Sequence, residues 1–205
     1  EVELQLKSLN ISLESYFCVI ITRIDDYYKN KIDRKTYDNN LMNLLEEMKK
    51  NGDGHLGVDS GYEIKTDTDK ILSVGRYVVN TVGSSSTTMK YDTIDKENEI
   101  LITLPSLFKD ASYIDVISEN IKEQMLEQKK EDDNKTYWVE GIENEGITER
   151  FEKISAEQNF YITSEGKLVI SFDKYEVAPG YMGIAEFEIP TDVISDILVS
   201  SEYIK

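Results

Sequence analysis

The stretch that decides the fold is residues 171–190, "SFDKYEVAPGYMGIAEFEIP". Apolar residues recur at every second position on both sides of its centre: Leu168, Ile170 and Phe172 lead into it, and Ala185, Phe187 and Ile189 close it. Because successive side chains of a strand point to opposite faces, this period predicts two strands. A proline and two glycines stand between them, which favours a tight connection. The stretch therefore predicts an antiparallel hairpin with a structured loop.

The centre of this loop carries large apolar groups where a turn would ordinarily be polar. Pro179 and Gly180 suit the central pair of a type II turn, in which proline fixes φ and glycine takes a positive φ. Tyr181 and Met182 would then project from a rigid support. They would either fold back over the sheet edge or act as an anchor pair for a partner's cleft, since aromatic residues and methionine are enriched in both settings. Both interpretations remain open at this point.

Outward from the hairpin, apolar periodicity predicts further strands and helices. We expect strands at residues 61–67, 70–83, 87–95, 99–104, 159–163 and 167–173, and helices that begin near Asp33, Ser112 and Thr191, with a short helix within 138–154. Residues 11–24 read as a strand or as a strand that runs into a helix. The expected fold class is α+β, with antiparallel sheets, packed helices and two intertwined subdomains: an N-terminal α+β subdomain at 1–105 and a C-terminal one at 106–205.

Charge and cysteine content exclude several classes of function. The 205 residues contain 40 acidic and 23 basic side chains, a net charge of −17, which makes nucleic acid an unsuitable partner. The charge is either a solubilising surface or a means of steering a cationic partner. Cys18 and His55 are single in the chain, so we expect no intrachain disulfide and no zinc site. No apolar run approaches the ~20 residues of a membrane helix, so a membrane anchor would lie in a segment absent from this chain.

Motifs associated with catalysis are present only in part. "GDGHLG" (52–57) has the spacing of a dinucleotide loop but follows an expected helix rather than a strand, and "SLFK" (106–109) lacks the companion motifs of penicillin-recognising enzymes. Glu186 and Glu188 share a strand face, as a glycosidase pair would, but an outward polar face explains them equally. We therefore expect no catalytic residue, no cofactor and no metal, and do not expect an enzyme.

Three stretches in fixed order carry a family resemblance: "YEIKTDTDKILSVGRYVV", "EILITLPSLFKDASYIDVISENIKEQM" and "FEKISAEQNFYITSEGKLVISFDKYEVAPGYMGIAEFEIP". They resemble the extracellular domain of RsiV-type anti-sigma factors, which is shared with PdaC-like peptidoglycan deacetylases and other Gram-positive surface proteins. The resemblance covers about residues 60–205. One departure is "GSSSTTMKYD" (83–92), where family members often carry a Gly-Ala-His-Pro-like stretch.

The resemblance implies an extracytoplasmic domain at the cell surface, anchored by an N-terminal transmembrane segment outside this chain. Such a domain binds lysozyme, and in some members inhibits it, while a further N-terminal segment holds an extracytoplasmic-function sigma factor until regulated proteolysis releases it. The alternative is a wall-associated module that does not signal. On either side of the turn, the residues expected to contact a partner are Tyr175, Glu176, Ala178, Pro179, Gly180, Tyr181, Met182, Glu186 and Glu188.

Overall fold

The computed structural model of the chain describes residues 56–82, 84–143 and 149–205. From Gly57 to Lys205 these residues belong to one compact unit. The elements in order are β1 (Leu56–Asp67), β2 (Ile71–Val82), β3 (Ser84–Asp95), β4 (Ile100–Ile102), η1 (Leu104–Leu107), α4 (Tyr113–Glu131), β5 (Phe160–Ile162), β6 (Leu168–Phe172), η2 (Gly180–Met182), β7 (Ala185–Ile189), α5 (Thr191–Ile194) and η3 (Ser195–Ile197), where η marks a 3₁₀ helix.

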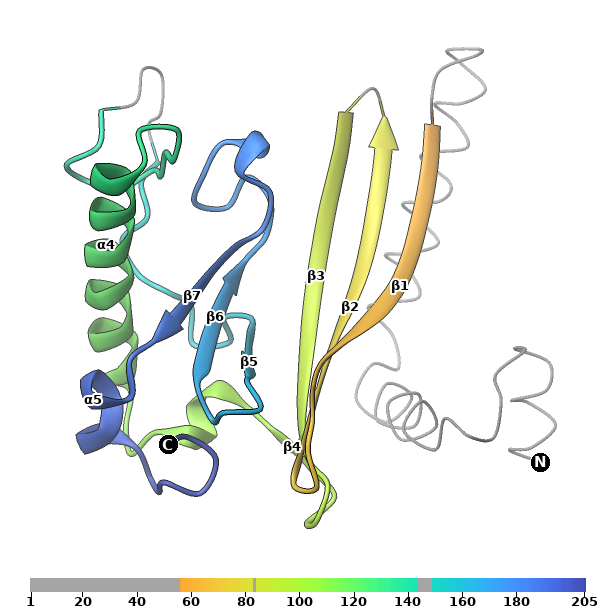
Figure 1. Ribbon diagram of the computed structural model, residues 1–205, viewed down its shortest axis with the longest axis vertical. Helices are drawn as coiled ribbons and strands as arrows, with labels where there is room; N and C mark the ends of the chain where they lie inside the picture. Colours follow the sequence, from red (N-terminus) through yellow and green to blue (C-terminus); the bar gives the residue numbers. More distant parts are fainter. Residues whose placement is uncertain (1–55, 83, 144–148) are drawn as a thin grey trace, which may run out of the picture. The chain divides into compact units, whose positions relative to one another are not determined.

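The first sheet has four strands in the order β1-β2-β3-β4 (Figure 1). β2 and β3 pair antiparallel along their whole length, from Ile71 opposite Asp95 to Val82 opposite Ser84. Asp95 then closes the turn into β4, because its Oδ1 atom accepts hydrogen bonds from the backbone N–H groups of Glu97 (2.9 Å) and Asn98 (2.8 Å). Such a turn, in which an aspartate bonds the backbone two residues on, needs no glycine.

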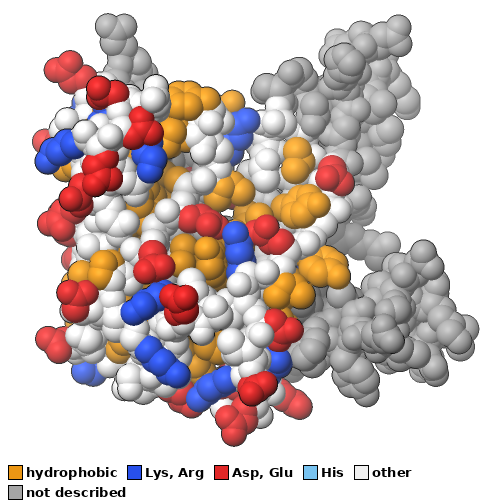
Figure 2. Space-filling model, viewed as in Figure 1, with side chains coloured by type: hydrophobic (Ala, Val, Ile, Leu, Met, Phe, Trp, Pro, Cys, Tyr) orange, Lys and Arg blue, Asp and Glu red, His pale blue; other side chains and the backbone are white. Residues whose placement is uncertain are grey.

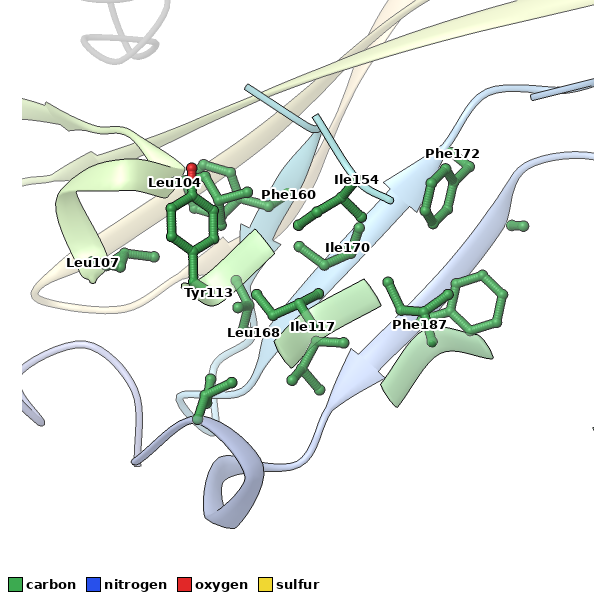
Figure 3. Packing of buried hydrophobic residues seen from close by; sticks show 14 of the residues in the cluster. Leu104, Leu107, Tyr113, Ile117, Ile154, Phe160, Leu168, Ile170, Phe172 and Phe187 are labelled. Carbon is green, nitrogen blue, oxygen red and sulfur yellow. The ribbon is translucent and has the colours of Figure 1, made fainter. Parts of the chain in front are cut away.

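The second sheet has three antiparallel strands in the order β5-β6-β7. Helix α4 lies along one face of it, and the three fully buried side chains Ile117, Ile121 and Met125 come from the helix face that contacts the sheet. Figures 1 and 3 show the helix beside the sheet and the aromatic rings of Phe172 and Phe187 among the aliphatic side chains of this core. The two rings meet edge to face with centroids 5.8 Å apart, a favoured geometry for aromatic pairs.

The other face of the second sheet packs against the first sheet. A small cluster of Met89, Tyr91, Tyr161 and Val169 joins β3 to β5 and β6. This contact explains why β6 is buried on both faces, whereas β7 alternates between buried and exposed residues. Both clusters belong to the same compact unit.

The α+β class with antiparallel sheets is confirmed, and the strands quoted above lie where alternation predicts them. The expected subdomain boundary at residue 105 falls between β4 and α4, inside the compact unit. The expected helix near Asp33, the stretch 11–24, Cys18 and His55 lie outside the described residues.

One local expectation is corrected by the structure. Ser112, with Asp115 three residues on, has the spacing of a helix cap, but the Ser112 side chain caps nothing; its backbone N–H instead bonds Asp110 Oδ1 at 2.8 Å, since Ser112 has helical dihedral angles. The short helix expected within 138–154 stays a prediction, because residues 138–143 and 149–154 contain no helix and residues 144–148 lie outside the described residues. In the described part, Gly141 has φ of 91°, and the N–H of Phe151 bonds the Trp138 carbonyl at 2.6 Å.

Candidate functional site

The loop between β6 and β7 turns through a 3₁₀ helix rather than through a type II turn. Pro179 has φ −58° and ψ 150° and its carbonyl accepts a bond from Met182 N–H at 2.9 Å. The positive φ belongs to Gly183 (70°) and not to Gly180, so the expected turn type is wrong. Proline still sets the start of the turn, because its ring fixes φ near the value that a 3₁₀ helix needs at its N-terminus.

Two tyrosines form the exposed part of this loop. Tyr181 is 69% exposed, and its hydroxyl donates to the Asn134 carbonyl at 3.1 Å, which fixes the ring against the segment after α4. Tyr175 is 50% exposed and has φ of 72°, which is uncommon for a residue with a side chain. Its ring lies over Gly180, where a Cβ atom would come within 2.2 Å of Tyr175 Cζ. Glycine is therefore required at 180 for this position of the ring.

The residues that lead into the turn of this loop are buried. Val177 and Ala178 are each 2% exposed, and the Val177 carbonyl accepts a bond from Trp138 N–H at 2.8 Å. Met182 is half-buried and packs against the main core. Of the residues expected to contact a partner, Ala178 and Met182 thus hold the loop in place, while the tyrosines present their rings to solvent.

Glu176 also acts as a support for the loop. One oxygen accepts a bond from Gln158 Nε2 (2.9 Å) and the other from the backbone N–H of Asp173 (2.7 Å). Asp173 in turn accepts a bond from the backbone N–H of Met89 on β3 (2.7 Å). Burial, opposed by this bond and assisted by the nearby Glu176, raises the pKa of Asp173 above its usual range. The base of the loop is therefore tied to both sheets.

Glu186 joins β7 to the first sheet through a cluster of polar groups. Its carboxylate accepts bonds from the hydroxyls of Tyr91 (2.8 Å) and Tyr161 (3.2 Å), and Lys65 Nζ lies 3.3 Å from it. Lys65 also pairs with Glu63 at 2.9 Å and stands over both tyrosine rings, 5.7 Å from the centroid of Tyr91 and 5.2 Å from that of Tyr161. Lys65 therefore makes both cation–π interactions and charge-assisted hydrogen bonds.

The protonation states of this cluster are fixed at neutral pH. Burial, followed by the Glu186 carboxylate, raises the pKa of Tyr91 and of Tyr161 well above the usual 10.0. Burial lowers the pKa of Lys65, but the carboxylates of Glu63 and Glu186 outweigh it and raise that pKa above 10.5. Both hydroxyls thus remain donors and the amine remains charged.

Glu188, two residues further on the same strand face, is exposed, and its carboxylate makes no hydrogen bond or ion pair within residues 56–82, 84–143 and 149–205. The two glutamates therefore have different roles: Glu186 is engaged by two tyrosines and a lysine, and Glu188 faces solvent. Within the described residues no three His, Cys, Asp or Glu side chains gather where a metal ion would bind, and no helix is both long and apolar enough to cross a bilayer.

Figure 2 shows acidic side chains spread over the face of the molecule seen in Figure 1, with hydrophobic patches between them. Sequence reasoning identified the loop but missed Lys65, Tyr91, Tyr161 and Asn134. Alternation along β1 and β3 indicates which face a residue occupies, but no pattern in the sequence indicates that Tyr91 and Glu186, 95 positions apart, share a hydrogen bond.

Comparison with known proteins gives one family match and one relative of known name. Residues 105–192 match the family described as "Protein of unknown function (DUF3298)". The chain is 55% identical over 162 residues to the protein named "Anti-sigma-V factor RsiV" from Bacillus subtilis (strain 168); the match covers 79% of this chain and 55% of that protein. The chain thus spans about half the length of this relative.

Two solved structures share the fold at low sequence identity. A DUF3298 family protein from Pseudomonas aeruginosa PAO1 has a TM-score of 0.55 at 12% identity, covering 78% of this chain and 70% of the other. A member of the same family from Bacteroides fragilis NCTC 9343 has a TM-score of 0.55 at 16% identity, covering 86% and 68%. The family match at residues 105–192 and the shared fold agree with each other, and the 55% identity to the Bacillus subtilis protein confirms the resemblance to the extracellular domain of RsiV-type anti-sigma factors.

Proposed function

We propose that this chain is the extracytoplasmic receptor domain of an anti-sigma factor, and that it binds lysozyme through the loop between β6 and β7. In this proposal, a sigma factor is held by a segment outside residues 1–205, and lysozyme binding leads to proteolysis that releases it. In this proposal the chain itself catalyses no reaction, and Glu186 and Glu188 contribute contacts and negative charge.

The observation that carries the proposal is the 55% identity to the Bacillus subtilis anti-sigma-V factor over 79% of this chain. At this level of identity the matched regions share their fold. The anti-sigma role is thus supported by the relative, whereas lysozyme as the ligand rests on the resemblance together with the properties of the loop.

The loop has the properties of an anchor. Tyr175 and Tyr181 are large and exposed, and each is held in place: the Tyr175 ring lies over Gly180, and the Tyr181 hydroxyl bonds the Asn134 carbonyl. Little conformational entropy is therefore lost when a partner covers them. Rigid aromatic residues of this kind are enriched among those that dominate binding energy. A cleft that accepts a narrow, rigid projection suits this shape.

Charge supports a basic partner. Animal lysozymes are strongly basic, and the net charge of −17 would accelerate encounter with such a protein. Salt screens this attraction with a Debye length of about 8 Å at physiological ionic strength. It therefore affects the association rate more than the dissociation rate. The loop contacts, by contrast, should determine how long the complex lasts.

Surface plasmon resonance with animal lysozyme tests the proposal. We expect Tyr181→Ala to cost about 2 kcal/mol, a loss of about thirtyfold in affinity that appears mainly as faster dissociation. Tyr62→Ala is the matched control, because Tyr62 is also exposed (59%) but lies on the face of β1 opposite Lys65. Raised salt should slow association of both variants and of the wild type alike.

Two outcomes would contradict the proposal. An unchanged dissociation rate for folded Tyr181→Ala would remove the loop from binding. Failure of the wild type to bind any animal lysozyme would leave the alternative, a wall-associated module that does not signal. Co-purification of a sigma factor with the full-length protein, but not with this chain, tests the anti-sigma part separately.

A further inference from the structure

The sheet β5-β6-β7 has two edges, and one of them is closed by side chains. At the β5 edge the carbonyl of Ile162 accepts bonds from the hydroxyls of Thr66 (2.6 Å) and Ser73 (3.3 Å), and its N–H lies 3.5 Å from Ser73 Oγ. The first sheet thus supplies the hydrogen-bond partners that a fourth strand would otherwise supply. No strand can be added there.

The bonds of β6 show which way the backbone groups of β7 point. The N–H of Ser171 bonds the Asn159 carbonyl at 2.9 Å, so Ser171 is directed toward β5. Because N–H and C=O of one residue point to the same side of a strand and alternate along it, Ile170 is directed toward β7. Its register partner is Phe187, so the backbone groups of Phe187 are used within the sheet.

It follows that Glu186 and Glu188 direct their backbone groups away from β6. One observation confirms this direction: the Glu188 carbonyl accepts a bond from Gln124 Nε2 of α4 at 2.9 Å, outside the sheet. The N–H and C=O of Glu186 and the N–H of Glu188 have no hydrogen-bond partner within the described part of the chain. β7 therefore offers two donors and one acceptor in a row at an open edge.

We propose that this edge of β7 binds an extended, lysine- or arginine-bearing segment of a partner protein, which adds as a fourth strand to the sheet. Strand addition is a recurrent mode of peptide recognition, in which main-chain bonds give affinity and alternate side chains give specificity. The proposal does not depend on lysozyme being the ligand of the loop.

The side chains beside the edge determine the chemistry of the segment. Glu186 and Glu188 lie on the same face of β7. Glu186 is already paired with Lys65 and two tyrosine hydroxyls, so the exposed Glu188 supplies the carboxylate that no described residue pairs. An added strand would place its own residues about 5 Å from them, where opposite charges stabilise a cross-strand pair and like charges destabilise it. A second copy of β7 would bring carboxylates against carboxylates, so charge opposes self-association at this edge. A basic segment is the occupant that the edge fits.

Amide hydrogen exchange on the wild-type chain is the first test. We expect the amides of Glu186 and Glu188 to exchange rapidly, and the amide of Phe187 between them to be protected, because it bonds within the sheet. A short synthetic peptide that alternates lysine and valine should slow exchange at 186 and 188 and leave Phe187 unchanged. The same peptide with glutamate in place of lysine should have no effect.

A pair of variants separates the backbone from the side chain. Glu188→Pro removes the outward N–H, and proline is tolerated on an edge strand where that group faces solvent. Glu188→Ala removes the same carboxylate but keeps the N–H. We expect the proline variant to bind the lysine peptide about tenfold more weakly than the alanine variant, because proline lacks the N–H that would bond the peptide and its ring takes the place of that group.

Three results would overturn the proposal: protected amides at 186 and 188 in the free chain, equal binding of the lysine and glutamate peptides, or equal affinity of the two variants for the lysine peptide. The exchange measurement uses the wild type, so it decides the matter even where the proline variant does not fold. Concentration-dependent protection without peptide would assign the edge to self-association instead.

Discussion

Tyr203→Phe is the perturbation whose effect follows most directly from the structure. Asp95 is fully buried at the end of β3, and its carboxylate accepts bonds from Tyr203 Oη (2.6 Å), from Asn98 Nδ2 (2.9 Å) and from the backbone N–H groups of Glu97 and Asn98. Removal of the Tyr203 hydroxyl leaves the ring and its contact with Lys70, whose Nζ atom lies 5.4 Å from the centroid. The substitution thus isolates one hydrogen bond.

The size of the effect can be worked from the pKa of Asp95. Burial alone would raise this pKa, but the hydrogen bonds, that of Tyr203 first among them, lower it from 3.8 to about 2. A lowering of this extent corresponds to about 2 kcal/mol in favour of the ionised form. Because Tyr203 contributes the largest share, we expect Tyr203→Phe to lower the free energy of unfolding by about 1 to 2 kcal/mol at pH 7, in line with bonds to charged groups.

The effect must also depend on pH in a defined direction. A carboxylate whose pKa is lower in the folded than in the unfolded chain stabilises the fold above the unfolded value, and this stability is lost as pH falls through the folded value. For Asp95 the window extends from about 4 down to about 2. In Tyr203→Phe the folded pKa of Asp95 rises, so the stability difference between the two proteins should be constant above pH 4 and narrow below it.

Urea denaturation followed by the fluorescence of Trp138, at steps from neutral to acid pH, measures this difference. A carbon-13 NMR titration of the Asp95 carboxyl reports the pKa itself. Tyr62→Phe is the control, since Tyr62 is 59% exposed and its hydroxyl has no hydrogen-bond partner in the described part of the chain; its stability should stay within ~0.5 kcal/mol of the wild type. A difference that is absent at pH 7, or that widens in acid, would refute the reasoning.

Two further predictions concern the core and the loop. Ile121→Ala should lower the free energy of unfolding by about 2 to 5 kcal/mol in urea denaturation, because Ile121 is fully buried under the second sheet. The control is Val199→Ala, which should have little effect because Val199 is 60% exposed. Equal losses of stability in the two variants would contradict the assigned core. Gly180→Ala should displace the Tyr175 ring, since the new Cβ would lie 2.2 Å from its Cζ atom. We expect weaker lysozyme binding at a nearly unchanged melting temperature, and unaltered chemical shifts of the Tyr175 ring would contradict that contact.

The elements of the C-terminal half follow from local pattern. Alternation at Leu168, Ile170 and Phe172 predicts β6, and the same period predicts β7. The spacing of Ile114, Ile117, Ile121 and Met125 predicts the buried face of α4; Ile114 is partly buried and the other three are fully buried. The predictions of β7 and α4 succeed because each of these elements buries one face, and the period of its apolar residues indicates which face that is. β6 is buried on both faces, because it lies between α4 and the first sheet.

The loop was only partly predictable, for a local reason. Pro179 and Gly180 fix the presence of a turn, but several turn types begin with proline, and the type depends on where φ becomes positive. That residue is Gly183, and the ring of Tyr175 occupies the space that Gly180 leaves. The positions of Gly183 and of the Tyr175 ring both had to be known before the turn type could be assigned.

By itself, the sequence determined the strands, the main helix, the acid excess and the presence of a structured loop, because each depends on neighbours within a few positions or on composition alone. The tertiary structure decided how these parts meet. Tyr203 reaches Asp95 across 108 positions, Thr66 reaches the β5 edge across 96, and Glu186 meets Tyr91 across 95. Such bonds arise when sheets and helix pack against one another and buried polar groups must find partners. Only the assembled fold therefore shows which sheet edge is closed, and which edge and which glutamate have no partner among the residues that the structure describes.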